Sequence, residues 1–172
     1  MPNTLDTLLA TPVLSRIRRN HGLEHATIHI LSKKVPGIST AGHSDAGGFW
    51  LLGDLDTEQV RAAVHEALAR MRAGEHHLAV HPNCGTNFVV SGAFAGLAGA
   101  AALMGARRPS DKLSRLPLAM TFATIALILV HPLGFRVQQR VTTSGHPGTL
   151  EIVGINPTRR GRWQAHRILT RG

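Results

Sequence analysis

The stretch Leu116–Phe135, "LPLAMTFATIALILVHPLGF", contains no Asp, Glu, Lys or Arg. A bilayer core about 30 Å thick is crossed by roughly 20 apolar residues in a helix that rises about 1.5 Å per residue. The stretch has this length, so it predicts a membrane-spanning helix. A buried helix of a soluble core is the alternative that the pattern leaves open.

A second uncharged stretch, Phe88–Ala106, "FVVSGAFAGLAGAAALMGA", comes before it. Only the short polar segment 107–115 separates the two, so together they predict a transmembrane helical hairpin over residues 88–135. Gly92 and Gly96 are four residues apart, a small-residue spacing that lets helices approach closely in lipid. We therefore expect this face to support a homo-oligomer.

Residues 1–87 predict a membrane-proximal lobe of two helices and a short β-hairpin. Thr11 as N-cap and Pro12 at the first helical position begin the first helix. Short apolar runs on either side of 45–48 predict the hairpin. A capping box predicts a second helix from about residue 57 to 73.

The C-terminal segment, 136–172, predicts a short β segment followed by a basic tail. Its two strands are expected to turn at 145–148, and the tail beyond them to fray or lie along anionic lipid. The resulting fold class is α+β, mainly helical: a transmembrane hairpin, with a lobe of helices and short β-hairpins beside the membrane.

Composition narrows the choice of partners. The chain has 172 residues, with 19 Lys and Arg against 10 Asp and Glu, a net charge of +9 that favours nucleic acid or an anionic membrane surface. With no Tyr, two Trp and five Phe it is poor in stacking platforms, so we expect membrane lipid and not nucleic acid. The single cysteine excludes an intrachain disulfide and fits a reducing compartment.

The segment 18–31, "RRNHGLEHATIHIL", places His21, Glu24 and His25 close together on a helix. Their order, H-x-x-E-H, is the inverted form of a zinc motif in which two histidines bind the ion and the glutamate acts on its water. We therefore predict His21 and His25 as metal ligands and Glu24 as catalytic base, with His29 as an outer-shell partner or exposed to solvent. A histidine-rich helix without a metal is the plain alternative.

The segment 81–87, "HPNCGTN", supplies further ligands. His81 and Cys84 have an H-x-x-C spacing that suits one ion, and zinc is the expected metal. A simple turn that caps the next helix is the alternative. Asn87 is a candidate outer-shell residue. His131 is another, because a two-helix hairpin returns the end of its second helix to the membrane face where the first began.

These motifs resemble the YqhQ-like family of uncharacterised bacterial membrane proteins. The resemblance covers "HGLEH" and "HPNCGTNF", and then a membrane pair with "GFRVQQRVTTSGHPGTLEIVGI", from about residue 18 to 155. The chain departs from that family in its shorter length, in fewer membrane segments and in the module "GHSDAGGFWLLGDLDTEQ". The resemblance implies an integral membrane protein with a clustered His/Glu/Cys site and no established activity.

The leading hypothesis is a membrane-anchored metal-dependent hydrolase that acts on a peptide or lipid-linked substrate at the membrane interface. A non-catalytic protein with a structural His/Cys metal site and a tetrapyrrole-binding protein are the alternatives. The N-terminal stretch has its positive charges after its apolar part, unlike a secretory signal peptide. We therefore expect the bacterial inner membrane with a cytoplasmic lobe, although the basic loop 107–115 argues for the opposite orientation.

Overall fold

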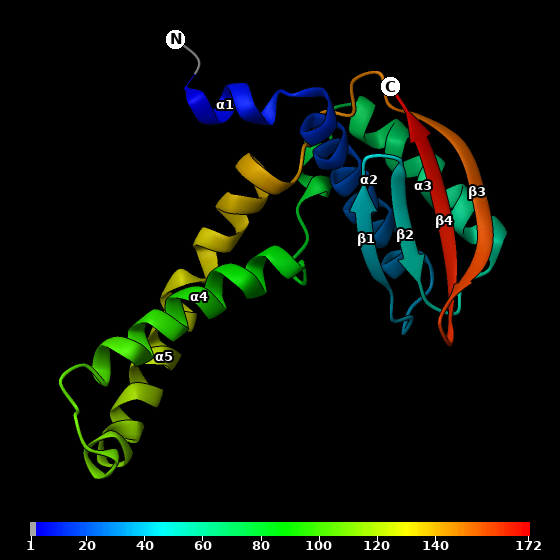
Figure 1. The fold of residues 1–172 in the computed structure, drawn as a ribbon. Helices are drawn as coiled ribbons and strands as arrows, with labels where there is room; N and C mark the ends of the chain where they lie inside the picture. The colour runs from blue at the N-terminus through cyan, green and yellow to red at the C-terminus, as the bar shows by residue number, and fades with distance from the viewer. Residues whose placement is uncertain (1–2) are drawn as a thin grey trace. The chain divides into compact units, whose positions relative to one another are not determined.

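The computed structural model describes residues 3–172 and divides the chain into two compact units. The α/β unit consists of Met1–His81 and Gln139–Gly172, and the helical unit of Pro82–Gln138. Figure 1 shows the course of the chain through both.

A four-stranded antiparallel sheet organises the α/β unit, with the strand order β1-β2-β4-β3. Its strands are β1 (Ala41–Asp45), β2 (Gly48–Leu52), β3 (Glu151–Arg160) and β4 (Trp163–Arg171). β4, at the end of the chain, pairs with β2 in the middle of the sheet, so the unit is closed by its own C-terminus (Figure 1).

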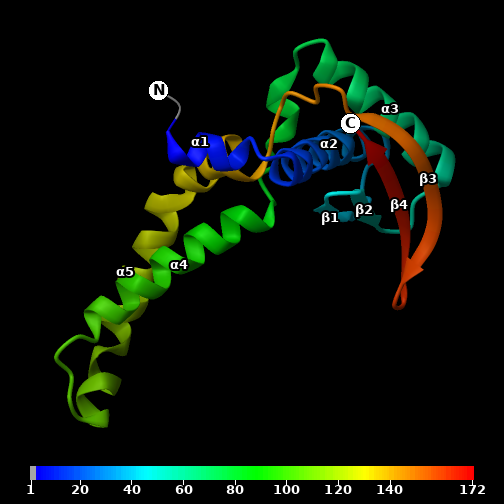
Figure 2. The same cartoon turned by 45° about the horizontal axis from the view of Figure 1, so that its top comes forward.

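Helices cover one face of this sheet (Figure 2). They are α2 (Pro12–Lys34) and α3 (Thr57–Arg72), with the short α1 (Thr4–Leu9) before them and the 3-10 turn η1 (His76–Ala79) after them. The predicted helix starts are confirmed: Thr11 is the N-cap of α2, and the Asp56 carboxylate caps α3 by accepting two backbone N–H groups. The hairpin predicted around residues 45–48 is confirmed as β1–β2.

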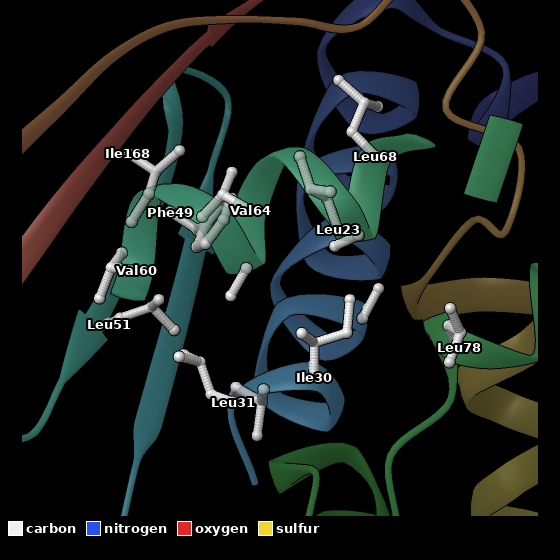
Figure 3. Close-up of a cluster of buried hydrophobic side chains, with 14 of the residues drawn as sticks. Leu23, Ile30, Leu31, Phe49, Leu51, Val60, Val64, Leu68, Leu78 and Ile168 are labelled. Atoms are coloured by element: carbon white, nitrogen blue, oxygen red, sulfur yellow. The ribbon is translucent and has the colours of Figure 1, made fainter. Parts of the chain in front are cut away.

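The core lies between the two helices and the sheet (Figure 3). Its buried members include Leu23, Ile30 and Leu31 of α2, Phe49 and Leu51 of β2, Val60, Val64 and Leu68 of α3, Leu78 of η1 and Ile168 of β4. Because α2 is packed through its apolar stripe, the position of its other side chains is fixed by the same core.

The helical unit is an antiparallel pair, α4 (Gly85–Ala102) and α5 (Pro109–Val137), and α5 runs on into the π-helical turn η2 (Gln138–Thr142). Both helices are long and apolar enough to cross a membrane, and only 11% of the apolar stretch in each is buried. An added Cβ on Gly92 or Gly96 would meet nothing within 4 Å, so that face is not used to pack α4 on α5. The predicted class, α+β and mainly helical, is confirmed.

The prediction for the C-terminal segment is wrong in its details. The first expected strand, before the turn, is helical up to Thr142, and residues 143–150 form a loop without strands. The second expected strand is confirmed as the start of β3. The segment expected as a frayed basic tail, from residue 156 on, forms the rest of β3 and all of β4, which turn at Gly161 with φ 63°. The many arginines concealed the alternation of β4, in which His166, Ile168 and Thr170 are buried. Pairing with a neighbour on each side stabilises β4 regardless of its polar composition.

Candidate metal centre

Four histidine side chains of the α/β unit form an imidazole cluster. His21, His25 and His29 come from α2, and His81 follows η1. Ring centroids are 4.4 Å apart for His21 and His25, 5.7 Å for His25 and His81, and 4.8 Å for His29 and His81. The four-residue spacing on α2 therefore brings His21 and His25 together, and His81, from a distant part of the chain, contacts both His25 and His29.

Backbone carbonyls orient the two rings of the predicted zinc motif. The Nδ1 of His21 lies 2.9 Å from the Thr142 carbonyl oxygen, and the Nδ1 of His25 lies 2.8 Å from that of Ala79. Since a carbonyl oxygen can only accept, each Nδ1 carries the proton and each Nε2 presents a lone pair. Metal-binding histidines are held in this way, with the non-ligating nitrogen donating to a carbonyl or carboxylate.

His29 is held by the opposite ring nitrogen. Its Nε2 donates to the Val80 carbonyl oxygen at 2.8 Å, so its Nδ1 carries the lone pair. The ring is only partly exposed and lies against His81, and is not turned fully to solvent. The consecutive carbonyls of Ala79 and Val80 thus accept hydrogen bonds from His25 and His29, which are one helical turn apart on α2.

Protonation of the His81 ring is disfavoured. Burial, and then the nearby imidazoles of His29 and His25, lower the pKa of His81 to about 4. At neutral pH the ring is therefore uncharged and keeps a nitrogen lone pair, the form that binds metal ions.

Glu24 lies on the side of α2 that faces β1. Its side chain is buried, and the Ser44 hydroxyl donates a hydrogen bond to its carboxylate. Burial raises the pKa of Glu24 against the opposing effects of Ser44 and His21, which lower it. A Cβ on Gly42 of β1 would overlap the carboxylate, so the absence of a side chain there leaves room for the acid.

Gly22 permits the segments that carry the orienting carbonyls to approach α2. A Cβ at this position would overlap the Ser144 carbonyl oxygen and lie 3.2 Å from the Cβ of Ala79. The π-helical turn η2 ends at Thr142, whose carbonyl holds His21; such turns are frequent at functional sites. Gly22 was recognised in the sequence only through the family resemblance, because its role depends on contacts made by distant residues.

The other predicted site residues belong to the helical unit. Cys84 is the N-cap of α4 and comes three residues after His81 in the sequence. The side-chain amide of Asn87 donates to the Pro82 carbonyl at 2.8 Å and accepts from Gln138 at 2.6 Å, and the His131 ring lies 5.1 Å from that of Phe135. Their roles at a metal stay predictions.

Sequence reasoning missed one buried histidine. His166 of β4 lies 3.0 Å from the Thr57 hydroxyl through its Nε2, and burial lowers its pKa. No local motif marks it, because its partner is the first residue of α3, 109 positions away. We interpret it as a structural contact between β4 and α3.

The fold and the cluster define an α+β protein with an apolar helical pair and a group of four imidazoles in its α/β unit. The chain belongs to the family described as "Domain of unknown function (DUF6391)", whose model matches residues 16–155 and so includes the whole imidazole cluster.

The chain is also similar to an individual protein over most of its length. An uncharacterised protein of Picosynechococcus sp. is 38% identical over 138 residues, which cover 74% of this chain and 66% of that protein, just under two thirds of its length. No solved structure matches the chain. The resemblance to the YqhQ-like family stays a prediction.

Proposed function

We propose that the protein is a membrane-anchored, metal-dependent hydrolase. In this proposal His21 and His25 bind a zinc ion through Nε2, and His81 and Cys84 complete the ligand set. The observation that carries it is the pair of hydrogen bonds from Nδ1 of His21 and His25 to the carbonyls of Thr142 and Ala79. These bonds select the tautomer that a metal needs and fix both rings before it binds.

The donor set suits zinc. Imidazole nitrogen and thiolate sulfur are its usual protein ligands, and catalytic sites use three of them. Cys84 follows His81 by three residues, and an extended chain of this length spans about 10 Å, so both can reach one ion. The low pKa of His81 keeps its ring neutral without competition from protons.

Glu24 is the proposed proton acceptor. A zinc ion lowers the pKa of a coordinated water to about 7, which brings its proton within reach of a nearby carboxylate. Burial raises the pKa of Glu24, which makes its carboxylate a stronger proton acceptor than an exposed one. The Ser44 hydroxyl holds the carboxylate, and its electrostatic interaction with His21 places it near the proposed ligands.

The exposed apolar surface of α4 and α5 supports a membrane anchor. Phe88, Leu97, Ile128 and Leu129 each expose more than six tenths of their surface, far more than buried core helices allow. We propose that the pair spans the bacterial inner membrane with the α/β unit in the cytoplasm, and that the substrate is a peptide or lipid-linked molecule at the interface.

Metal content and activity test the proposal in turn. The full chain, purified in detergent without chelators, should contain zinc by elemental analysis. His21→Ala should contain one zinc per chain fewer than the wild type, while His65→Ala, at an exposed position of α3, should contain the same number. Glu24→Gln should keep the metal but lose hydrolysis of membrane-incorporated fluorogenic peptides or lipid-linked esters. A wild-type chain that takes up no metal would overturn the proposal.

A second function, a structural metal site, is favoured by one observation. The carbonyls that hold His21, His25 and His29 come from two segments far apart in sequence, so the cluster joins α2 to η1 and to the end of η2. A metal there would stabilise the α/β unit whether or not it reacts. Retained function in Glu24→Gln, together with lost folding in His25→Ala, would select this alternative.

A further inference from the structure

A second group of histidines lies in the α/β unit, outside the imidazole cluster. His76 begins η1, and His146 lies in the loop between η2 and β3. Their ring centroids are 4.0 Å apart with the planes inclined at 42°. Both side chains are exposed, so a pair so close together in space is not explained by burial in the core.

The backbone is shaped to bring these two rings together. The Nδ1 of His76 lies 2.8 Å from the Gly145 carbonyl oxygen, so it carries the proton and Nε2 presents a lone pair. A Cβ at Gly145 would lie 2.7 Å from both the Cβ and the carbonyl oxygen of His76. Only glycine at this position allows the loop to approach η1 so closely.

The pair opens into a cavity of about 370 Å³. His77 also lines it, giving three imidazoles, and no Asp, Glu, Lys or Arg side chain is among its lining residues. Ala79 and Val80 form part of the same wall. Nitrogen donors without carboxylates favour a transition metal over Ca²⁺ or Mg²⁺, which need oxygen ligands.

We propose that His76 and His146 bind a second divalent transition-metal ion of the Zn²⁺, Ni²⁺ or Cu²⁺ class. This site is independent of the imidazole cluster, because it uses none of its side chains. The two sites use neighbouring backbone: the carbonyls of Ala79 and Val80 hold His25 and His29, and Thr142, whose carbonyl holds His21, precedes Thr143 of the cavity wall. An ion at the pair would link η1 to the loop 143–150 and so stabilise both.

Equilibrium dialysis against Zn²⁺ tests this proposal on the full chain in detergent micelles. The double variant His76→Ala/His146→Ala should bind one ion fewer per chain than the wild type, whereas the matched control His65→Ala should bind the same number. Equal stoichiometry in the wild type and the double variant would overturn the proposal.

Two single substitutions keep the test decisive. His146 is exposed in a loop, so His146→Ala removes a ligand without touching the core and should lose the same ion even if the double variant fails to fold. Gly145→Ala removes no ligand, but should lose the ion by forcing His76 away. If Gly145→Ala binds as the wild type does, the proposed geometry is wrong.

The number of ions lost in the double variant does not depend on whether the proposed function, with its metal at the imidazole cluster, is correct. If the imidazole cluster holds no metal, the wild type binds one ion and the double variant none. If the cluster holds one, the numbers are two and one. The difference of one ion per chain belongs to the His76–His146 pair in either case.

Discussion

His25 on α2 donates its Nδ1–H to the carbonyl oxygen of Ala79, 54 residues further along the chain, at 2.8 Å. The next carbonyl, that of Val80, accepts from His29. The last residue of η1 and the residue after it thus fix two rings of the helix, and the next residue is His81. The orientation of the proposed ligands is therefore set by backbone atoms, which substitution of neighbouring side chains leaves in place.

Gly22→Ala should reduce both stability and metal binding. The added Cβ would meet the Ser144 carbonyl and the Ala79 side chain, and overpacking of this kind costs about 1–3 kcal/mol. We expect a lower free energy of unfolding and a lower zinc content than in the wild type. Gly92→Ala is the control, because its Cβ would meet nothing within 4 Å; equal losses in the two variants would contradict the role assigned to Gly22.

Ser44→Ala should raise the pKa of Glu24 further. The hydrogen bond from Ser44 favours the charged carboxylate, so its removal favours the protonated acid. Carboxyl ¹³C chemical shifts followed by NMR should place the Glu24 titration at higher pH than in the wild type. A titration at unchanged or lower pH would show that Ser44 does not hold the carboxylate.

Acid should destabilise the metal-free protein through His81. Its pKa is about 4 in the folded state and about 6.5 when unfolded, so below pH 6.5 the unfolded state binds more protons. The free energy of unfolding should fall as the pH drops from about 6.5 towards 4. Below about pH 4 the contribution of His81 to stability is fully lost. Denaturant titrations of His81→Gln should show a shallower fall in this window. A slope equal to that of the wild type would argue against the shifted pKa.

His166→Ala should destabilise the fold without changing the metal content. The substitution removes the contact to the Thr57 hydroxyl and leaves a small cavity between β4 and α3. Removal of a buried hydrogen-bonding side chain typically costs about 1–3 kcal/mol. Denaturation and elemental analysis on the same sample check both parts, and loss of zinc together with retained stability would contradict them.

Local patterns were sufficient to predict the histidine face of α2, the caps of α2 and α3 and the apolar helical pair. Each of these depends on residues within one or two turns of one another. His81 was predicted from its H-x-x-C spacing, but its approach to His25 and His29 depends on the path of η1.

Long-range pairing accounts for what the sequence did not reveal. β4 lies between β2 and β3, so its backbone partners are 100 or more residues away on one side, and its arginines obscure the alternation. The pairing of His76 with His146 depends on a glycine contact that no spacing rule describes. Such features arise from tertiary packing and not from periodicity.

X-ray absorption spectroscopy at the zinc edge, on the purified full chain with one equivalent of zinc, identifies the atoms that bind the ion. We expect nitrogen ligands at about 2.0 Å and one sulfur at about 2.3 Å, with nitrogen scattering reduced in His21→Ala and His25→Ala. A first shell of oxygen alone, or one unchanged by both substitutions, would contradict it.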